Sequence, residues 1–244
     1  MHNIFYIGKG DVEIIMARYL WCEDSKSGYQ FWKTIIGKIY PDIIVETKRG
    51  NTRLRKSVER IDNDGNQYYI VMDSAIDNPD VLRETRRLSA DISGKGNVHS
   101  ISIHSFEFVL LSFELLEEWV FAEVDPLRDN RRRVLAASNI FVSRIKDKGN
   151  ANALKDFKDV FDEYKARNSE QIASKLLFEI TRNTGFETNK SKLGECFVVN
   201  CCDRTTRQDD DVCGLDDNRI NSIEKAKLIV EYSVLGETIE KVGL

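Results

Sequence analysis

Short apolar runs alternate with amphipathic stretches through the first 105 residues of the chain. The runs that are rich in β-branched and aromatic side chains, as strands are, cover residues 4–7, 41–46, 68–72 and 97–103. The stretches with apolar side chains at helical spacing cover residues 12–20, 54–61 and 80–89. The run at 68–72 is almost unbroken, so we expect that strand to be covered on both faces. The alternation predicts an α/β fold, a small Rossmann-like parallel sheet flanked by helices.

The pattern changes in the second half of the chain. A strongly periodic stretch at 106–121 predicts a helix, and strand-like runs stop after Pro126. Further stretches with helical spacing and charged faces cover residues 131–145, 151–167, 169–182 and 219–235. We therefore predict an α/β domain over residues 1–125 and a mostly helical C-terminal region over 126–244, with an irregular, cysteine-rich segment near 190–218.

Composition narrows the class of protein. The 244 residues are 41% apolar and 31% charged, so the chain can bury a core without disulfide bonds. No run of about 18 apolar residues predicts a membrane span, and residues 1–6 do not read as a secretory signal. We expect a cytoplasmic protein with reduced thiols. The net charge of -4 excludes a globally basic nucleic-acid coat but allows local basic patches.

Four of the five cysteines lie in the last quarter of the chain, at Cys196, Cys201, Cys202 and Cys213. Four thiolates can hold a structural zinc ion, and buried thiols or redox chemistry are the alternatives. The spacing lacks the usual pair of cysteines two residues apart, and adjacent cysteines fit one ion poorly. We therefore expect neither a disulfide nor zinc in residues 196–213.

Polar residues follow each of the first three expected strands. Ligands of open α/β sheets bind beyond the carboxyl ends of the strands, so these residues form the candidate site. The groups that follow the strands are Gly8, Lys9, Gly10 and Asp11, then Gly50 and Asn51, then Asp73 and Asp77. The glycine loop at 8–10 could cradle a phosphate or simply form a turn.

Acidic side chains are the candidate metal ligands. Asp73 and Asp77 could hold Mg²⁺, or Asp73 could end its strand while Asp77 caps the next helix. Glu107 lies in an apolar stretch, where a carboxylate is costly to bury unless it is paired or binds metal; it could also belong to a solvated helix face. We expect His99 and His104, which flank the fourth strand, to be surface or hydrogen-bonded histidines.

Basic residues cluster near the expected strand ends, among them Arg53. They could form a rim that contacts phosphates, or they could be solvated helix faces.

The arrangement of a strand, a glycine loop with Asp11, a Gly-Asn turn, and an apolar strand that ends in Asp73 resembles the TOPRIM fold. More narrowly, it is similar to the TOPRIM-type nuclease domains of OLD-family enzymes and their relatives in bacterial phage defence, over about residues 3–120. The later glutamate of that family, within an apolar helical segment, looks like Glu107.

The resemblance implies cleavage of DNA or RNA that depends on Mg²⁺ or Mn²⁺, in an effector of anti-phage defence, with a partner ATPase or another defence-complex subunit. The metal ligands that it implies are Asp11, Asp73, Asp77 and Glu107. The implied catalytic residues are Asp73, Glu107 and Lys9, and the implied substrate contacts are Gly8, Gly10, Gly50, Asn51 and Arg53.

The sequence departs from the family's pattern at two acidic positions. Ile7 stands where the first motif has a glutamate, and Ala75 replaces the second aspartate of the Asp-x-Asp motif. Either the site is rebuilt from Asp73, Asp77 and Glu107, or the chain is a catalytically degenerate binding or sensor subunit of a defence complex. A third reading is an unrelated Rossmann-like nucleotide-binding domain.

Overall fold

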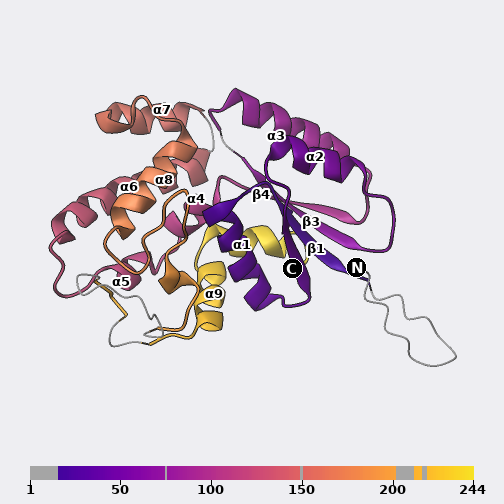
Figure 1. Cartoon of the computed structure of the whole chain (residues 1–244). Coiled ribbons are helices and arrows are strands. Elements are labelled where there is room, and N and C mark those ends of the chain that lie inside the picture. Colours follow the sequence, from indigo (N-terminus) through magenta and orange to yellow (C-terminus); the bar gives the residue numbers. More distant parts are fainter. Residues whose placement is uncertain (1–15, 75, 149–150, 202–211, 216–218) are drawn as a thin grey trace.

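The computed structural model describes residues 16–74, 76–148, 151–201, 212–215 and 219–244, and within them a four-stranded parallel sheet (Figure 1). The strand order is β2-β1-β3-β4. The strands are β1 (Arg18–Cys22), β2 (Ile43–Thr47), β3 (Gln67–Asp73) and β4 (Val98–Ile103). In the register, Cys22 pairs with Thr47 and Val71, and Asp73 pairs with Ile103, so the carboxyl ends of the strands lie along one edge. The predicted α/β class with a parallel sheet is confirmed.

The first described strand lies where the spacing of residues 12–20 predicts a helix. Tyr19 and Leu20 belong to β1, so that prediction is wrong over these residues. Leu20 and Cys22 are fully buried, and β1 pairs with β2 on one side and β3 on the other. Pairing and burial in the middle of the sheet thus override the local helical spacing. The strand expected at residues 4–7 lies outside the described residues.

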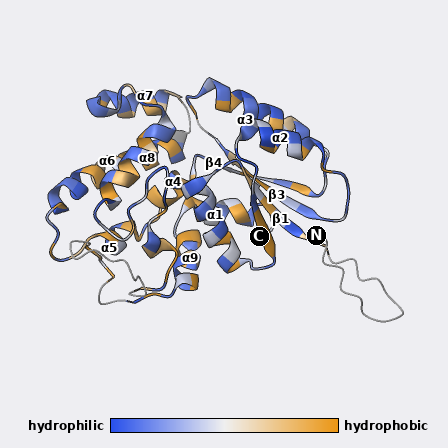
Figure 2. Ribbon diagram, viewed as in Figure 1, coloured by the Kyte–Doolittle hydropathy of each residue, from blue (hydrophilic) through white to orange (hydrophobic). Residues whose placement is uncertain are grey.

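Helices cover both faces of the sheet, as the unbroken apolar run of β3 predicts. On one face, α1 (Lys26–Ile39) packs against the core that includes Tyr69 and Val71. On the other, α2 (Asn51–Glu59) and α3 (Pro79–Ile92) cover Tyr68, Ile70 and Met72. Figure 2 shows α2 and α3 with hydrophilic outer faces.

The helix predicted over 106–121 is two helices, α4 (Phe106–Leu111) and α5 (Leu116–Val120). The break is a docking point for the C-terminal helices. The Ser112 hydroxyl donates to the Val109 carbonyl at 2.9 Å and accepts from the Val234 backbone at 3.2 Å. The Glu114 amide donates to the Tyr232 carbonyl at 2.9 Å. These contacts replace the helical hydrogen bonds that would continue α4.

The rest of the chain is mostly helical, as predicted. Its helices are α6 (Arg128–Lys148), α7 (Ala151–Val160), α8 (Ser169–Thr181), α9 (Ser222–Glu231) and α10 (Val234–Glu240), with short 3₁₀ turns at Asp162–Tyr164 and Glu195–Phe197. Helix α9 packs against α1, and the Lys38 ammonium donates to the Ser222 hydroxyl at 2.8 Å. The boundary near residue 125 stays a prediction.

A buried arginine ties α6 to the end of α8. The Arg131 guanidinium pairs with Asp125 at 2.7 Å and donates to the carbonyls of Ile180 and Arg182 at 2.7 and 2.6 Å. Its charge is compensated, which is what lets it be fully buried. Among the described residues, no helix is both long and apolar enough to cross a membrane.

Candidate functional site at the carboxyl edge of the sheet

Four half-buried carboxyl groups lie at the carboxyl edge of the sheet. Glu23 and Asp24 directly follow β1, Asp73 ends β3, and Glu107 lies in the first turn of α4, just beyond β4. The charges of Asp24, Glu23 and Glu107 all raise the pKa of Asp73, so the four groups lie within one another's field. We call this set the acidic edge.

The connection between β2 and α2 holds Glu23 in place. The Lys48 amide donates to the Cys22 carbonyl and the Gly50 amide donates to the Glu23 carbonyl, both at 2.8 Å. Gly50 has a φ of 117°, a conformation that favours glycine. The Asn51 side chain hydrogen-bonds to the Glu23 carboxylate. The structure therefore brings Gly50 and Asn51 to the acidic edge, whereas the predicted contact Arg53 is exposed on α2.

Asp24 is held against α1. Its Oδ2 accepts a hydrogen bond from Trp32 Nε1 at 2.8 Å, and its backbone carbonyl accepts one from the Thr47 hydroxyl. A Cβ added at Gly28 would come within 2.3 Å of Asp24 Oδ1 and 2.8 Å of its Cβ. Gly28 therefore leaves the space that the Asp24 side chain occupies.

We expect Gly28→Ala to displace the Asp24 side chain and to lower the free energy of unfolding by about 2 kcal/mol, as overpacking typically does. Gly37 lies in the same helix, and a Cβ there would meet nothing within 4 Å. Gly37→Ala is thus the matched control and should stabilise the protein by about 0.5–1 kcal/mol. Denaturant unfolding of both variants measures the effect; equal behaviour of the two would show that Gly28 is not constrained by Asp24.

Asp73 has a carboxyl oxygen with no partner. Its Oδ1 is inaccessible to solvent and accepts no hydrogen bond. The backbone around it is fixed, because the Ser74 amide donates to the Ile103 carbonyl at 2.6 Å and the Thr85 hydroxyl to the Asp73 carbonyl at 3.2 Å. Burial raises the Asp73 pKa well above its ordinary value, and the charges of Asp24, Glu23 and Glu107 raise it further. An unpaired carboxylate here is costly unless a proton or a cation compensates it.

The other members of the acidic edge show the same shift. Burial first, and then the Asp24 charge, raises the pKa of Glu23 to about 8. Burial raises the pKa of Asp24 to about 6, although the bond from Trp32 opposes it. Burial raises the pKa of Glu107 to about 7, with Asp24 and Glu170 adding to it and hydrogen bonds from its own backbone and Ser105 opposing it. Crowded carboxyl groups with raised pKa values are common at functional sites.

Asp77, predicted as a metal ligand or a helix cap, is engaged by the C-terminal region. Its Oδ1 accepts from the Ser169 amide at 3.0 Å and hydroxyl at 2.6 Å, and its Oδ2 lies 3.6 Å from the Lys158 ammonium. The N-cap of α3 is Asn78, which accepts from the Asp80 and Val81 amides. Asp77 therefore joins the loop after β3 to α7 and α8.

Glu170 brings a fifth carboxyl group close to the edge from the first turn of α8. Burial and the Asp77 charge raise its pKa, and its charge in turn raises the pKa of Asp73, Glu23 and Glu107. Sequence reasoning missed Glu170, which no local pattern distinguishes from other helix-start glutamates.

Sequence reasoning also missed Glu23 and Asp24. The sequence signal for them is the apolar, aromatic run of residues 19–22, which is followed at once by two acids. Six residues of the predicted site or its motifs lie outside the described residues, and their roles stay predictions: Ile7, Gly8, Lys9, Gly10, Asp11 and Ala75.

His104, expected at the surface or hydrogen-bonded, is buried with neither ring nitrogen partnered. It follows β4 and packs against the rings of Phe108 and Phe141. Burial lowers its pKa to about 4, although the charge of Asp77 opposes the shift. The imidazole is therefore neutral at pH 7.

Within the part of the chain that the structure describes, no three His, Cys, Asp or Glu side chains are placed so that they could hold a metal ion. This covers Cys196, Cys201 and Cys213, which are not in disulfides. Cys202 lies outside the described residues, so the expectation of no zinc and no disulfide at 196–213 stays a prediction.

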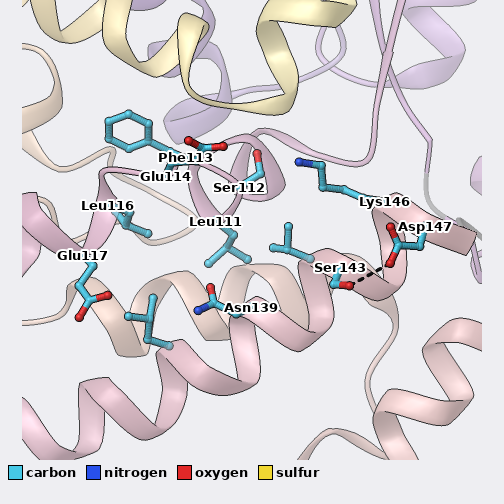
Figure 3. A pocket seen from close by; sticks show the side chains of 12 residues that line it. Leu111, Ser112, Phe113, Glu114, Leu116, Glu117, Asn139, Ser143, Lys146 and Asp147 are labelled. Carbon is cyan, nitrogen blue, oxygen red and sulfur yellow. Dashed lines mark hydrogen bonds between the residues drawn. The ribbon is translucent and has the colours of Figure 1, made fainter.

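A separate groove of about 400 Å³ lies between the α4–α5 segment and α6 (Figure 3). Its polar lining includes Glu114, Asn139 and Lys146, and the Ser143 hydroxyl donates to Asp147 Oδ2 at 3.0 Å. No residue of the acidic edge lines this groove.

The fold and the acidic edge together define an α/β protein with a crowded carboxyl site where its parallel strands end. Comparisons with protein families, with curated proteins and with solved structures find no match to this chain.

Proposed function

We propose that this chain is a metal-dependent, nuclease-like protein that hydrolyses phosphodiester bonds in DNA or RNA at the acidic edge. The observation that carries the proposal is the Asp73 carboxylate. It ends the sheet's longest strand, one oxygen is shielded from solvent without a partner, and three further carboxyl groups surround it. A divalent cation supplies the compensation that the protein itself lacks at this point.

The donor atoms fit Mg²⁺ or Mn²⁺, which take oxygen ligands from carboxylates and water. Glu23 and Asp73 would hold the ion, with Asp24 or Glu107 completing the set after side-chain rotation. When bound, such an ion polarises a phosphate and activates water. The chain's own contribution is to fix the carboxylates, through the sheet for Asp73, α1 for Asp24 and the β2–α2 connection for Glu23.

The resemblance to TOPRIM-type nuclease domains stays a proposal, because Ile7, Gly8, Asp11 and Ala75, on which its acidic motifs are compared, lie outside the described residues. Independently of that resemblance, Glu23 directly follows β1 and places an acid at the end of a central strand. A role in bacterial anti-phage defence, a partner ATPase and a cytoplasmic location are proposals that rest on the resemblance and the composition.

A specific observation favours the second candidate, a catalytically degenerate binding or sensor subunit. As they stand, no three side chains among the described residues are placed to hold an ion. In this reading the acidic edge binds no catalytic ion, and the chain binds nucleic acid or a partner protein without cleaving.

Incubation of the purified chain with plasmid, single-stranded DNA and total RNA in Mn²⁺, Mg²⁺ or EDTA separates the two candidates. We expect weak cleavage in Mn²⁺, less in Mg²⁺ and none in EDTA. Binding without cleavage in any cation would favour the degenerate subunit. Release of a mononucleotide on denaturation would instead favour the nucleotide-binding reading.

A further inference from the structure

Three exposed cations lie in a row along helix α2. Arg53, Lys56 and Arg60 are spaced i, i+3, i+7, which places them on one face of a helix. Arg60 belongs to the row because it closes the helix in the right-handed helical conformation. Leu54 and Val58, which are fully buried, point to the opposite side. We call Arg53, Lys56 and Arg60 the α2 stripe; Figure 2 shows the outer face of α2 as hydrophilic.

The charges of the α2 stripe form no ion pairs within the described part of the fold. Among the described residues, none of the three has a carboxylate within ion-pair distance. Arg55 on the flank of the same helix differs, because it pairs with Glu59 and lies 3.6 and 3.5 Å from Glu84 and Asp91. Arg55 thus joins α2 to α3, while the stripe faces solvent in a protein whose net charge is -4.

The stripe begins beside the acidic edge. The Gly50 amide donates to the Glu23 carbonyl at 2.8 Å, the Asn51 side chain bonds the Glu23 carboxylate, and the Arg53 amide donates to the Gly50 carbonyl at 3.1 Å. From Arg53 to Arg60 the helix rises about 10 Å, close to three base steps at about 3.4 Å per nucleotide of one strand. The row is therefore long enough to contact the phosphates of several nucleotides in a strand that leaves the edge.

We propose that the α2 stripe binds the phosphate backbone of the nucleic acid and leads it away from the acidic edge. The inference rests on the proposed function for its substrate class and adds the surface that holds the substrate. Contacts of this kind set affinity and position without reading sequence, so DNA and RNA share the chemistry.

The test is fluorescence anisotropy with labelled 20-nucleotide single-stranded DNA, duplex DNA and RNA, in EDTA over about 50–300 mM KCl. The variant is Arg53→Gln/Lys56→Gln/Arg60→Gln, since glutamine keeps helix propensity. The matched control removes three other exposed cations that have no ion pair among the described residues, as Arg132→Gln/Arg144→Gln/Lys227→Gln.

We expect the stripe variant to lose about 30-fold or more in affinity at low salt, with a salt slope shallower by about 2–3, and the control to lose far less. Equal losses in the two variants would overturn the inference, as would a wild type that binds no nucleic acid or binds anionic vesicles or polyglutamate equally well. Binding that depends on the stripe, without metal-dependent cleavage, would contradict the proposed function but not this inference. Cleavage that the stripe variant retains in full would contradict this inference but not the proposed function.

Discussion

Replacing Asp73 by asparagine should abolish Mn²⁺-dependent cleavage while the protein stays folded. Asparagine keeps the shape of the side chain and removes the charge at the point where the other carboxyl groups of the acidic edge converge. The cation loses its central ligand. The cleavage rate should therefore fall at least about 10³-fold, to the detection limit of the assay. The same change removes a buried carboxyl group whose pKa is raised well above its ordinary value, which costs stability at pH 8, so the metal-free variant should melt higher than wild type at that pH.

The control for this prediction is Asp62→Asn, which removes a charge from an exposed aspartate. It should leave both cleavage and the melting temperature unchanged. Wild-type cleavage by Asp73→Asn would show that the acidic edge is not the site. A fall in its melting temperature at pH 8 would show that the Asp73 carboxyl group stabilises the metal-free fold.

The metal-free protein should lose stability as the pH rises from 6.5 to 8.5. The pKa values of Glu107 and Glu23 are raised to about 7 and 8, so the folded state holds protons that the unfolded chain has already released. The contribution of these two groups to the free energy of unfolding is fully present below the ordinary carboxyl pKa near 4. It is lost as the pH rises through 7 and 8. His104, whose pKa is lowered to about 4, is neutral throughout this window and does not oppose the trend.

We expect the melting temperature to fall by about 5 °C. This corresponds to a loss of about 2 kcal/mol in the free energy of unfolding for a domain of this length. Scanning calorimetry in EDTA measures it, and Glu23→Gln should flatten the profile. Added Mn²⁺ should restore the melting temperature at pH 8.5, because the ion binds only the deprotonated carboxylates. A melting temperature that is constant or rises over this window would contradict the raised pKa values.

The sequence predicted the fold correctly where the spacing of the apolar residues agrees with their burial in the structure. The unbroken apolar run before Asp73 predicted a strand covered on both faces, and Tyr69 and Val71 do face one helical layer while Ile70 faces the other. The same reasoning failed at Tyr19, because apolar spacing in residues 12–20 fits a helix locally. Only pairing with β2 and β3, which no local pattern contains, makes this segment a strand.

The sequence likewise predicted some residues of the candidate site and missed others. Asp73 and Glu107 follow from a strand end and from a carboxylate within an apolar stretch, and the structure brings both to one edge. Glu23 and Asp24 were missed as soon as their strand was read as a helix. Glu170 is distant in sequence, and only the packing of α8 beside the sheet's edge brings its charge there.

The most direct test of the acidic edge as a cation site is an anomalous difference map from crystals grown in Mn²⁺ above pH 8, because a higher pH favours the ionised carboxyl groups that bind the ion. We expect a peak about 2–2.3 Å from carboxylate oxygens of Asp73 and Glu23. A map with no peak at the edge, or with Mn²⁺ only in the groove between α5 and α6, would contradict it.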